Sequence, residues 1–388
     1  MNRFFRILLA FGFFALLGLP MLHLFGVKET WTRIAGWEKQ VALPEFSFAA
    51  CTNRSYQTQF AEHFSKEFFL RKSFLRTSMQ LHEWANFGLF HYGYGVLDGR
   101  GGVLFETPYA QFHLDRSREV KPGMYAEVLA KLRELDRQCE SMGADFVFLT
   151  MPDKLQLYPE LLPRWLDWFW DFSLFDTQAK MTEICERAGI RTFDVNRYLM
   201  ERKGEWKEWV YPPFGTHFNA YGCGLVYEGL VDFLGRRARN RFRANRFTGV
   251  RRRQAEWSVD DDIGNLMNVW WNWRLEANPH YEPVFASTNE IMNAGSALAF
   301  GDCYREQVKC ILRDAKLFDP NRIVCAQRHG KETAERLREI TGDLRLVMMV
   351  YQSFNTDQLD NRIVEVENIL NVLRESAVLN KNSSRRRK

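Results

Sequence analysis

Apolar runs and amphipathic stretches alternate along most of the chain. Five short apolar runs suit strands that are buried on both faces, and they span residues 145–151, 190–195, 297–301, 322–325 and 344–351. Amphipathic stretches with helical spacing span residues 125–142, 174–188, 219–234, 304–315, 331–340 and 357–373. Strands that alternate with helices predict an α/β fold of three layers, with a central, mostly parallel sheet. Sites in such sheets lie at the carboxyl ends of the strands.

The N-terminal segment departs from this pattern. Arg3 and Arg6 precede an apolar stretch from Ile7 to Gly26, which at about twenty residues is long enough to cross a bilayer as a helix. Basic residues on its N-terminal side predict that the following domain lies outside the cytoplasm. We therefore expect a single-pass anchor in a bacterial inner membrane, with the main domain in the periplasm. A cleaved signal peptide is the alternative.

The pattern divides the chain into four parts. We expect a membrane anchor or signal sequence over 1–26, and a stalk with a helical lead-in over 27–84, where apolar residues recur at helical spacing from Phe60 to Trp84. A glycine-rich segment at 93–105 predicts two short strands joined by a tight turn. It belongs to the α/β domain, which we place at 85–376. Residues 377–388 form a polar, basic tail that we expect to be disordered.

Composition and charge narrow the classes of function. The chain has 388 residues, of which 46% are hydrophobic and 26% charged, so a substantial core is expected. Its net charge is only +5, but nine arginines gather between residues 236 and 253, in a basic insertion at about 236–256. Such a cluster suits an anionic partner, and export disfavours nucleic acid; a solvated loop fits equally well. Without a Cys-x-x-Cys pair, a P-loop or a dinucleotide fingerprint, we expect no metal and no cofactor.

Two residues suggest covalent chemistry. Cys303 follows the apolar run 297–301 and precedes a predicted helix. A thiol at a helix N-terminus faces unpaired N–H groups, which favour the thiolate and can hold an oxyanion. His217 lies in Gly215–Asn219 just before another predicted helix, which Asn219 can cap. A nucleophile and a base are the minimum for acyl transfer. The alternatives are a small residue packed at a turn and a surface histidine.

These motifs resemble those of the alginate O-acetyltransferase proteins of the AlgJ/AlgX type, whose catalytic domain has a circularly permuted SGNH-hydrolase fold. In that family an Asp-x-His-Trp-Asn motif precedes an Asp-Ser motif. The resemblance puts His217 in the position of the base and Cys303, after Asp302, in that of the nucleophile. Three further segments that resemble family elements occur in the same order, at residues 99–105, 152–159 and 262–266.

The chain differs from the family pattern at two positions. Gly215 stands where the family has the aspartate that orients the histidine, and Cys303 stands where it has serine. Because a thiol is more acidic than a hydroxyl, a Cys-His pair can work with little or no third member. A carboxylate from elsewhere, such as Asp153 or Asp302, is another replacement. The competing interpretation is a degenerate site that has lost its chemistry.

The resemblance implies an O-acetyltransferase that modifies an extracytoplasmic polysaccharide, anionic or neutral, through an acyl-enzyme. A membrane-bound O-acyltransferase partner would supply the donor. The implied catalytic residues are Cys303, His217 and Asp302, and the implied substrate-binding residues are Lys154, Asn219, Tyr304 and Arg305. The alternative function is a non-catalytic subunit that binds polymer or partners in an exopolysaccharide modification or secretion complex. An esterase that removes the same groups is a third hypothesis.

Overall fold

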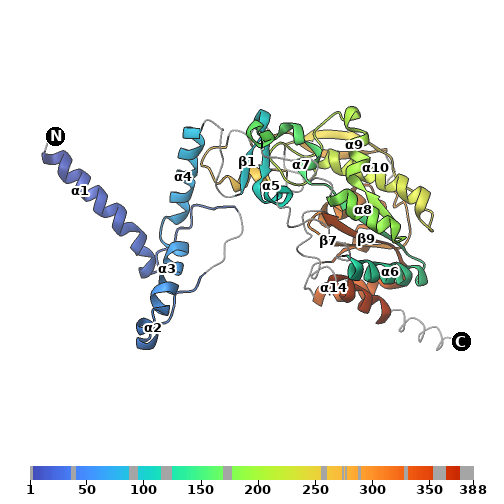
Figure 1. The fold of residues 1–388 in the computed structure, drawn as a ribbon, viewed down its shortest axis with the longest axis horizontal. Helices are drawn as coiled ribbons and strands as arrows, with labels where there is room; N and C mark the ends of the chain where they lie inside the picture. The colour runs from blue at the N-terminus through green and yellow to red at the C-terminus, as the bar shows by residue number, and fades with distance from the viewer. Residues whose placement is uncertain are drawn as a thin grey trace. The chain divides into compact units, whose positions relative to one another are not determined.

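The computed structural model describes residues 3–35, 41–86, 95–114, 125–168, 177–254, 260–272, 275, 278–286, 290–326, 331–352 and 364–375. The chain divides into two compact units (Figure 1). Unit 1 comprises Met1–Val96 and Gly264–Glu276, and unit 2 comprises Leu97–Ile263 and Ala277–Lys388. The second segment of unit 1 falls within the range that the sequence assigns to the α/β domain.

The N-terminal part of unit 1 is helical. Helix α1 (Arg3–Gly18) continues into the 3₁₀ helix η1 (Leu19–Phe25). By length and composition the stretch Arg3–Phe25, with a mean hydropathy of 2.2, can cross a membrane, although a signal sequence has the same properties. No other helix in the described ranges meets these criteria. The expected N-terminal apolar helix is thus present, with the length and composition of a membrane span or a signal sequence.

The helical lead-in consists of separate helices. The short helix α2 (Phe48–Thr52) precedes α3 (Ser55–Glu67) and α4 (Arg71–Asn86). The sequence pattern suggests one helix from 60 to 84, but Leu70 has a left-handed φ of 66° and divides it. Aromatic rings stack one helical turn apart along α3, with ring centroids 6.0 Å apart for Tyr56 and Phe60 and 6.2 Å apart for Phe60 and Phe64.

Unit 2 contains the predicted parallel sheet. Five strands pair in the order β4-β3-β9-β7-β8, and all neighbours are parallel. In chain order they are β3 (Asp145–Met151), β4 (Thr192–Asp194), β7 (Ser296–Gly301), β8 (Ile323–Cys325) and β9 (Leu344–Gln352). Each of the five strands lies at one of the five predicted runs, with ends that differ by at most two residues. The runs predicted the strands because strands buried on both faces are continuously apolar. The α/β fold class is confirmed.

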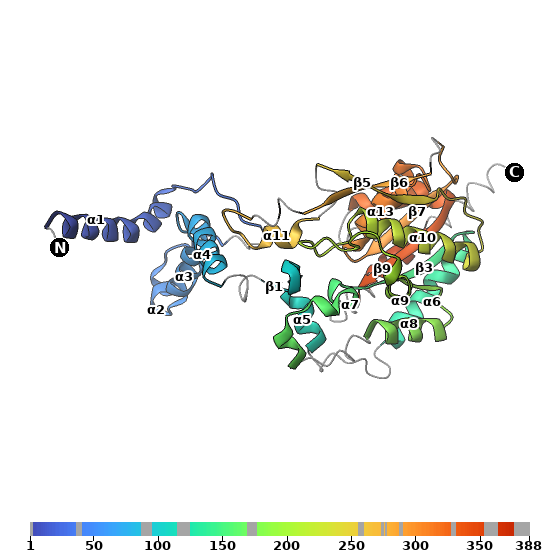
Figure 2. The ribbon, with the colours of Figure 1, turned by 90° about the horizontal axis from the view of Figure 1, so that it is seen from above.

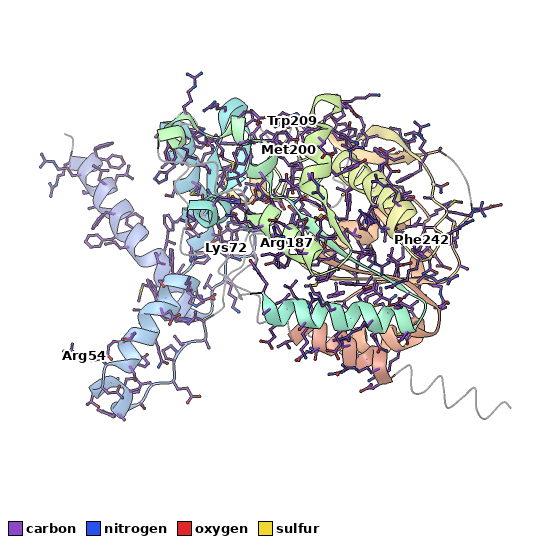
Figure 3. All side chains as sticks on the ribbon, turned by 45° about the vertical axis from the view of Figure 1, so that its right-hand side comes forward. Arg54, Lys72, Arg187, Met200, Trp209 and Phe242 are labelled. Atoms are coloured by element: carbon purple, nitrogen blue, oxygen red, sulfur yellow. The ribbon has the colours of Figure 1, made fainter. Side chains whose placement is uncertain are left out.

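Helices cover both faces of the sheet (Figures 1 and 2). Successive side chains of a strand point to opposite faces, so β3 places Val147 and Leu149 in one core and Phe146 and Phe148 in the other. The first core also receives side chains from α7 (Lys154–Leu157), α9 (Val195–Glu201), α10 (Ala220–Arg237) and α13 (Tyr304–Asp314). The second receives them from α6 (Ala126–Ser141), α8 (Thr177–Arg187), α14 (Lys331–Ile340) and the helix at 364–375. Figure 3 shows the side chains that fill these layers.

Two hairpins lie outside the central sheet. The glycine-rich segment forms the predicted strands β1 (Val96–Asp98) and β2 (Leu104–Glu106), which pair with each other and lead into α5 (Thr107–Leu114). The basic insertion is only partly a loop. It begins in the last turn of α10, crosses residues 238–246 without regular secondary structure, and continues in strand β5 (Phe247–Arg253), which pairs antiparallel with β6 (His280–Phe285). The expected disordered tail at 377–388 lies outside the described residues.

Candidate active site

Cys303 occupies the turn that joins strand β7 to helix α13. The strand ends at Gly301, whose φ of 109° lies in the region that favours glycine. A Cβ at that position would stand 2.1 Å from the carbonyl oxygen of Val350 on β9, so a side chain is excluded. Cys303 is the N-cap of α13 and is exposed. The structure thus places this thiol at the carboxyl end of the sheet, at the start of a helix.

His217 lies beside this thiol. Its Nε2 atom is 3.1 Å from Sγ of Cys303, which is hydrogen-bond distance for a sulfur atom. His217 is three residues before α10, and the N-cap of that helix is Asn219, whose side chain accepts from the N–H of Gly222 at 2.9 Å. The predicted cap is therefore confirmed. The two motifs, 86 residues apart in sequence, meet at one point of the fold.

A carboxylate that the sequence motifs do not indicate completes the group. Oδ2 of Asp262 lies 2.6 Å from Nδ1 of His217. Its other oxygen, Oδ1, accepts from the backbone N–H of Thr216 at 2.7 Å and of Ile263 at 2.9 Å. These two bonds fix the carboxylate against the histidine. Asp262 begins the short helix α11 (Asp262–Leu266).

Gly215 has no room for the aspartate of the resembled family. A Cβ at Gly215 would come within 2.4 Å of the carbonyl oxygen of Asp260 and within 2.5 Å of Cγ of Pro212. Both distances are shorter than any real Cβ contact, and the first involves backbone. The segment that carries Asp260 and Asp262 therefore fills the space beside Gly215.

The charges around His217 keep it protonated. Burial lowers its pKa, but the hydrogen bonds to Asp262 and Cys303, together with the charges of both groups, outweigh burial and raise the pKa to about 10. At neutral pH the imidazolium thus lies between a carboxylate and a sulfur atom.

A second carboxyl group close to the site has an unusual pKa. Burial, followed by the negative charge of Asp262, raises the pKa of Glu106 at the end of β2 to about 7, while His217 and Lys154 act in the opposite direction. Glu106 therefore changes charge near neutral pH, and it does so within the electrostatic reach of the His217–Asp262 pair.

Three residues that the sequence assigns to substrate binding are buried instead. The exposed fraction is 0% for Tyr304 and Asn219 and 2% for Lys154. The hydroxyl of Tyr304 donates to the carbonyl of Thr216 at 2.9 Å, and the amide of Asn219 donates to the carbonyl of Trp209 at 2.7 Å. Tyr304 thus holds the backbone next to His217, and Asn219 holds the segment that precedes it.

Lys154 holds the segment that leads to His217. Its Nζ lies within hydrogen-bond distance of four carbonyl oxygens, those of Leu104 at 2.8 Å, Pro212 at 2.6 Å, Pro213 at 2.8 Å and Gly215 at 3.0 Å, and its three N–H groups are shared among them. Burial holds the pKa of Lys154 well below its ordinary value, although the charges of Asp262 and Glu106 raise it. The sequence element that suggests substrate contact therefore serves to anchor the loop.

The two aspartates proposed as replacements for the missing carboxylate have other partners. Oδ2 of Asp302 accepts from the N–H of Gln352 at 2.7 Å. Asp153 caps α7 and lies 2.6 Å from Nε2 of His113. Neither is bonded to His217, so Asp302 fixes the turn that carries Cys303 and Asp262 takes the orienting position.

Arg305 also supports the turn at Cys303. Its Nη1 donates to the carbonyls of Gly301 and Asp302, both at 3.0 Å. It remains partly exposed, and these contacts give it a structural role at the turn.

Cys303 differs from the other cysteines in its accessibility. All seven lie in the described part of the chain, all are free, and Cys303 is the exposed one. Burial raises the pKa of Cys139 and of Cys185 to about 12, so these thiols are inert at neutral pH. The reactive position is thus singled out by the structure as well as by the motif.

Asp262 is the residue that sequence reasoning missed. It lies 45 residues after His217, in a segment noted for a different resemblance. The available signal is the run Asp260-Asp261-Asp262, in a chain whose histidine motif lacks its own acid.

Comparison of the sequence with family models and with curated proteins gives no match. Among solved structures, the chain is similar to the O-acetyltransferase domain of Pseudomonas putida AlgJ, with 16% identity and a TM-score of 0.46 over 71% of this chain and 99% of that one. It is also similar to Pseudomonas aeruginosa AlgX, with 14% identity and a TM-score of 0.44 over 71% of this chain and 70% of that one. A third similar structure is that of Bacillus cereus PatB1 with a sulfonyl adduct. Its sequence identity is 12% and its TM-score 0.45, and the match covers 67% of this chain and 95% of that one. AlgJ and AlgX give the resembled family its name, but scores this low carry no inference about function.

Proposed function

We propose that this protein is an O-acyltransferase that carries the acyl group as a thioester on Cys303 and delivers it to a hydroxyl group of a polysaccharide. The observation that carries the proposal is the chain of contacts from Asp262 through His217 to Sγ of Cys303, at 2.6 Å and 3.1 Å. A nucleophile, its base and a group that orients the base are the parts of covalent acyl transfer. The motif resemblance supplies the acyl group, acetyl, and the class of acceptor.

In the first half-reaction the thiolate of Cys303 attacks the carbonyl carbon of the acyl donor. A C–S bond forms, and the carbonyl π electrons move to oxygen. The tetrahedral intermediate then collapses and expels the donor's leaving group, which takes the proton from Nε2 of His217. The product is an acyl-thioester on Cys303 with a neutral imidazole beside it.

In the second half-reaction a sugar hydroxyl attacks the thioester. Nε2 of His217, now neutral, accepts the hydroxyl proton as the C–O bond forms. Collapse of the second intermediate breaks the C–S bond and returns Cys303 to the thiolate, with His217 protonated again. The ion pair of the resting site is thereby restored, and the acyl group resides on the sugar as an ester.

Backbone N–H groups at the start of α13 can hold the oxyanion of both intermediates. The first N–H groups of a helix have no partner inside it. Arg305 N–H already donates to the carbonyl of Asp302 at 3.0 Å, and Glu306 N–H donates to that of Cys303 at 3.1 Å. The N–H groups of Cys303 and Tyr304 precede these, so they are the ones we assign to the oxyanion hole.

The site suits extracytoplasmic chemistry if the apolar segment Arg3–Phe25 anchors the chain, with the α/β unit on the periplasmic side. A membrane-bound O-acyltransferase would then supply the acyl donor, as the motif resemblance implies. An exposed thiol is accessible to such a donor and to a polymer.

Acyl-enzyme trapping tests the proposal. The purified full-length chain, incubated with p-nitrophenyl acetate, is expected to carry one acetyl group on the peptide that contains Cys303, as detected by mass spectrometry. Cys303→Ala should lose this label, and the matched variant Cys51→Ala should retain it. Folded wild-type protein that gains no label at Cys303 would contradict the enzymatic function and favour the non-catalytic subunit.

Transfer and hydrolysis are separated in a second step. The isolated acetyl-enzyme is mixed with an oligosaccharide, and the fate of the acetyl group is followed by mass spectrometry. The proposal expects acetylated sugar to form faster than free acetate. Release as acetate alone, unaffected by the sugar, would instead identify an esterase.

A further inference from the structure

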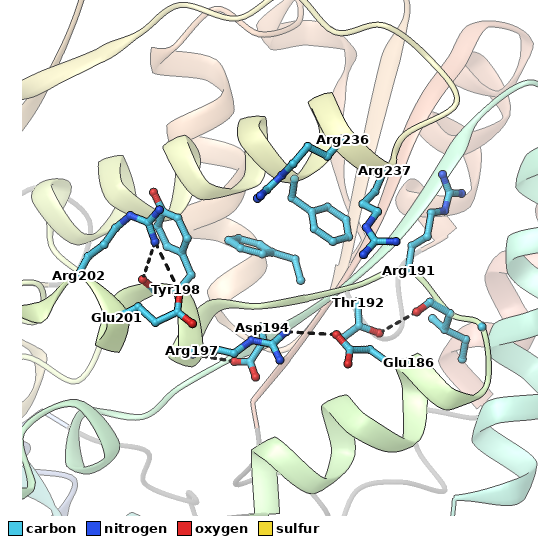
Figure 4. Close-up of a pocket in the computed structure, with 14 residues that line it drawn as sticks. Glu186, Arg191, Thr192, Asp194, Arg197, Tyr198, Glu201, Arg202, Arg236 and Arg237 are labelled. Atoms are coloured by element: carbon cyan, nitrogen blue, oxygen red, sulfur yellow. Dashed lines mark hydrogen bonds and ion pairs between the residues drawn. The ribbon is translucent and has the colours of Figure 1, made fainter.

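Unit 2 contains a cavity that is separate from the candidate active site. It has a volume of about 630 Å³ and lies between strand β4, helices α8 and α9 and the C-terminal end of α10 (Figure 4). Pockets that bind small molecules typically measure about 300–1,000 Å³. None of the residues that line it belongs to the Cys303 site.

Aromatic rings form the apolar part of this cavity. Phe193, Tyr198 and Phe233 line it, and the ring centroid of Phe193 is 5.7 Å from that of Tyr198 and 5.6 Å from that of Phe233. The rings lie close to α10 because Gly229 has no side chain: a Cβ there would stand 2.6 Å from Phe193 and 2.7 Å from Tyr198. Aromatic surfaces of this kind pack well against the apolar faces of sugar rings.

Five arginines line the cavity, and three of them have a carboxylate or an aromatic ring as partner. Arg191 binds Asp136 and Asp145, Arg197 binds Glu186 at 3.2 Å, and Arg202 lies 4.1 Å over the ring of Tyr198. The remaining two arginines, Arg236 and Arg237, are exposed in the last turn of α10. In the described part of the chain neither of these two forms an ion pair, and Figure 4 shows both extending toward the cavity.

These two arginines belong to the basic insertion singled out in the sequence. Two other members of the insertion form ion pairs, since Arg239 binds Glu140 at 3.1 Å and Arg251 binds Glu282. Of the insertion, only Arg236 and Arg237 line the cavity, and they bring its positive charge there. Guanidinium groups bind carboxylates through two parallel hydrogen bonds, which makes them suited to a planar acidic group.

We propose that this cavity is a second, non-catalytic binding site for an acidic oligosaccharide, with a sugar carboxylate on Arg236 and Arg237 and a sugar ring on the aromatic rings. Glu201, which also lines the cavity and has an exposed side chain, can accept hydrogen bonds from sugar hydroxyls. Asp194 is buried and caps α9 through the N–H of Arg197, so it is not assigned to the ligand. An acidic, hydroxyl-rich ligand satisfies both sets of groups.

Helix α10 connects the two sites. It starts three residues after His217 and ends at Arg237, and its 18 residues correspond to roughly 27 Å at about 1.5 Å per residue. A chain of several sugars is needed to span that distance. The assignment of the cavity as a distal subsite for the acceptor polymer rests on the proposed function, whereas the binding of an acidic sugar does not.

Calorimetric titration of the full-length chain in detergent tests the binding. The probes are tetragalacturonate, cellotetraose as a neutral sugar of equal length, and sodium phosphate. We expect tetragalacturonate to bind, with an affinity that falls as salt is raised. The double variant Arg236→Gln/Arg237→Gln should weaken binding at least about tenfold, since a hydrogen bond to a charged group contributes about 1.5–3 kcal/mol.

The matched control is Arg241→Gln/Arg243→Gln. It removes the same charge from the same exposed basic segment but does not touch the cavity, and it should leave the affinity within about twofold. The proposal is overturned if both double variants lose the same affinity for tetragalacturonate. It is also overturned if cellotetraose binds as tightly as tetragalacturonate, or if equimolar phosphate displaces tetragalacturonate fully. The titration is repeated in Cys303→Ala, which should bind equally well. A wild-type protein that binds tetragalacturonate but gains no acetyl label at Cys303 would reject the catalytic function and leave this site intact.

Discussion

The exchange Asp262→Asn tests whether Asp262 serves as the third member of the site. Asparagine keeps the size of the side chain, and its carbonyl oxygen can still accept from the N–H groups of Thr216 and Ile263, as Oδ1 of Asp262 does at 2.7 Å and 2.9 Å. Its amide group then faces Nδ1 of His217. Because an amide N–H donates, it selects the imidazole tautomer whose Nε2 carries the hydrogen, and that nitrogen can no longer accept a proton from Cys303 or from a sugar.

The size of the effect follows from the charge on His217. Asp262 is one of the groups that raise the pKa of His217 to about 10, so without the carboxylate the imidazole becomes mostly neutral at pH 7. A neutral imidazole no longer places a positive charge beside Sγ of Cys303, and this slows the attack by sulfur. With the loss of orientation added, we expect a decrease on the order of 10², smaller than the roughly 10⁴ measured for a serine triad.

The assay is the rate of acetyl labelling of Cys303 by p-nitrophenyl acetate, measured between pH 6 and 9. The rate for Asp262→Asn should depend on pH more steeply than that of the wild type, because the pKa of about 10 keeps the wild-type His217 charged over most of this range. The control is Asp261→Asn, one residue earlier in the same segment, whose carboxylate binds Asn278 and which should remain within about twofold of the wild type. Equal rates and equal pH profiles for Asp262→Asn and wild type would refute the triad.

Four further predictions follow from the same contacts. The pKa of His217 is raised from 6.5 to about 10, so its stabilising contribution is complete below about pH 6.5 and is lost as the pH rises through 10. Chemical denaturation should therefore show that the wild type is more stable than Asp262→Asn at pH 6.5 and that this difference shrinks as the pH rises to 10. Burial raises the pKa of Glu106 from 4.5 to about 7, so its contribution to stability is present below about pH 4.5 and is lost as the pH rises through 7. Glu106→Gln should therefore gain stability relative to the wild type between pH 5 and 8. A difference in unfolding free energy that stays constant over this range would contradict the prediction. Gly215→Ala should lower the free energy of unfolding by about 1–3 kcal/mol and slow acylation, since its Cβ meets the Asp260 carbonyl, whereas Gly204→Ala, which meets nothing within 4 Å, should do neither. Lys154→Met leaves four buried carbonyls without their donor and should cost roughly 3 kcal/mol or more, as read from a thermal or denaturant unfolding curve.

The central sheet was predictable from sequence because its strands have a simple signature. Strands buried on both faces are continuously apolar, and the run at Asp145–Met151 shows this along its whole length. The hairpin of β5 and β6 has no such signature. Three consecutive arginines end β5, and its outer residues are exposed, so the same letters suit a solvated loop.

The candidate site was predictable in part, for a related reason. Cys303 and His217 each lie at a local boundary, a strand end and a helix start, which a sequence displays directly. Asp262 is recognisable only once the chain has folded, because its role depends on a contact across 45 residues. The buried roles of Lys154 and Tyr304 were hidden likewise, since their partners are backbone carbonyls, which every residue has.

The absence of the aspartate at 215 and the presence of Asp262 are two aspects of one structural change. The carbonyl of Asp260 fills the space that a side chain at 215 would need, and the same segment, two residues later, places its carboxylate 2.6 Å from His217. An aspartate at 215 would push this segment away, and with it the acid that replaces it. Gly215 is thus a requirement of the alternative arrangement. Two backbone N–H bonds hold the substitute carboxylate in place. The thiol at 303 fits this interpretation, because a nucleophile that ionises more readily than serine makes a smaller demand on the relocated acid.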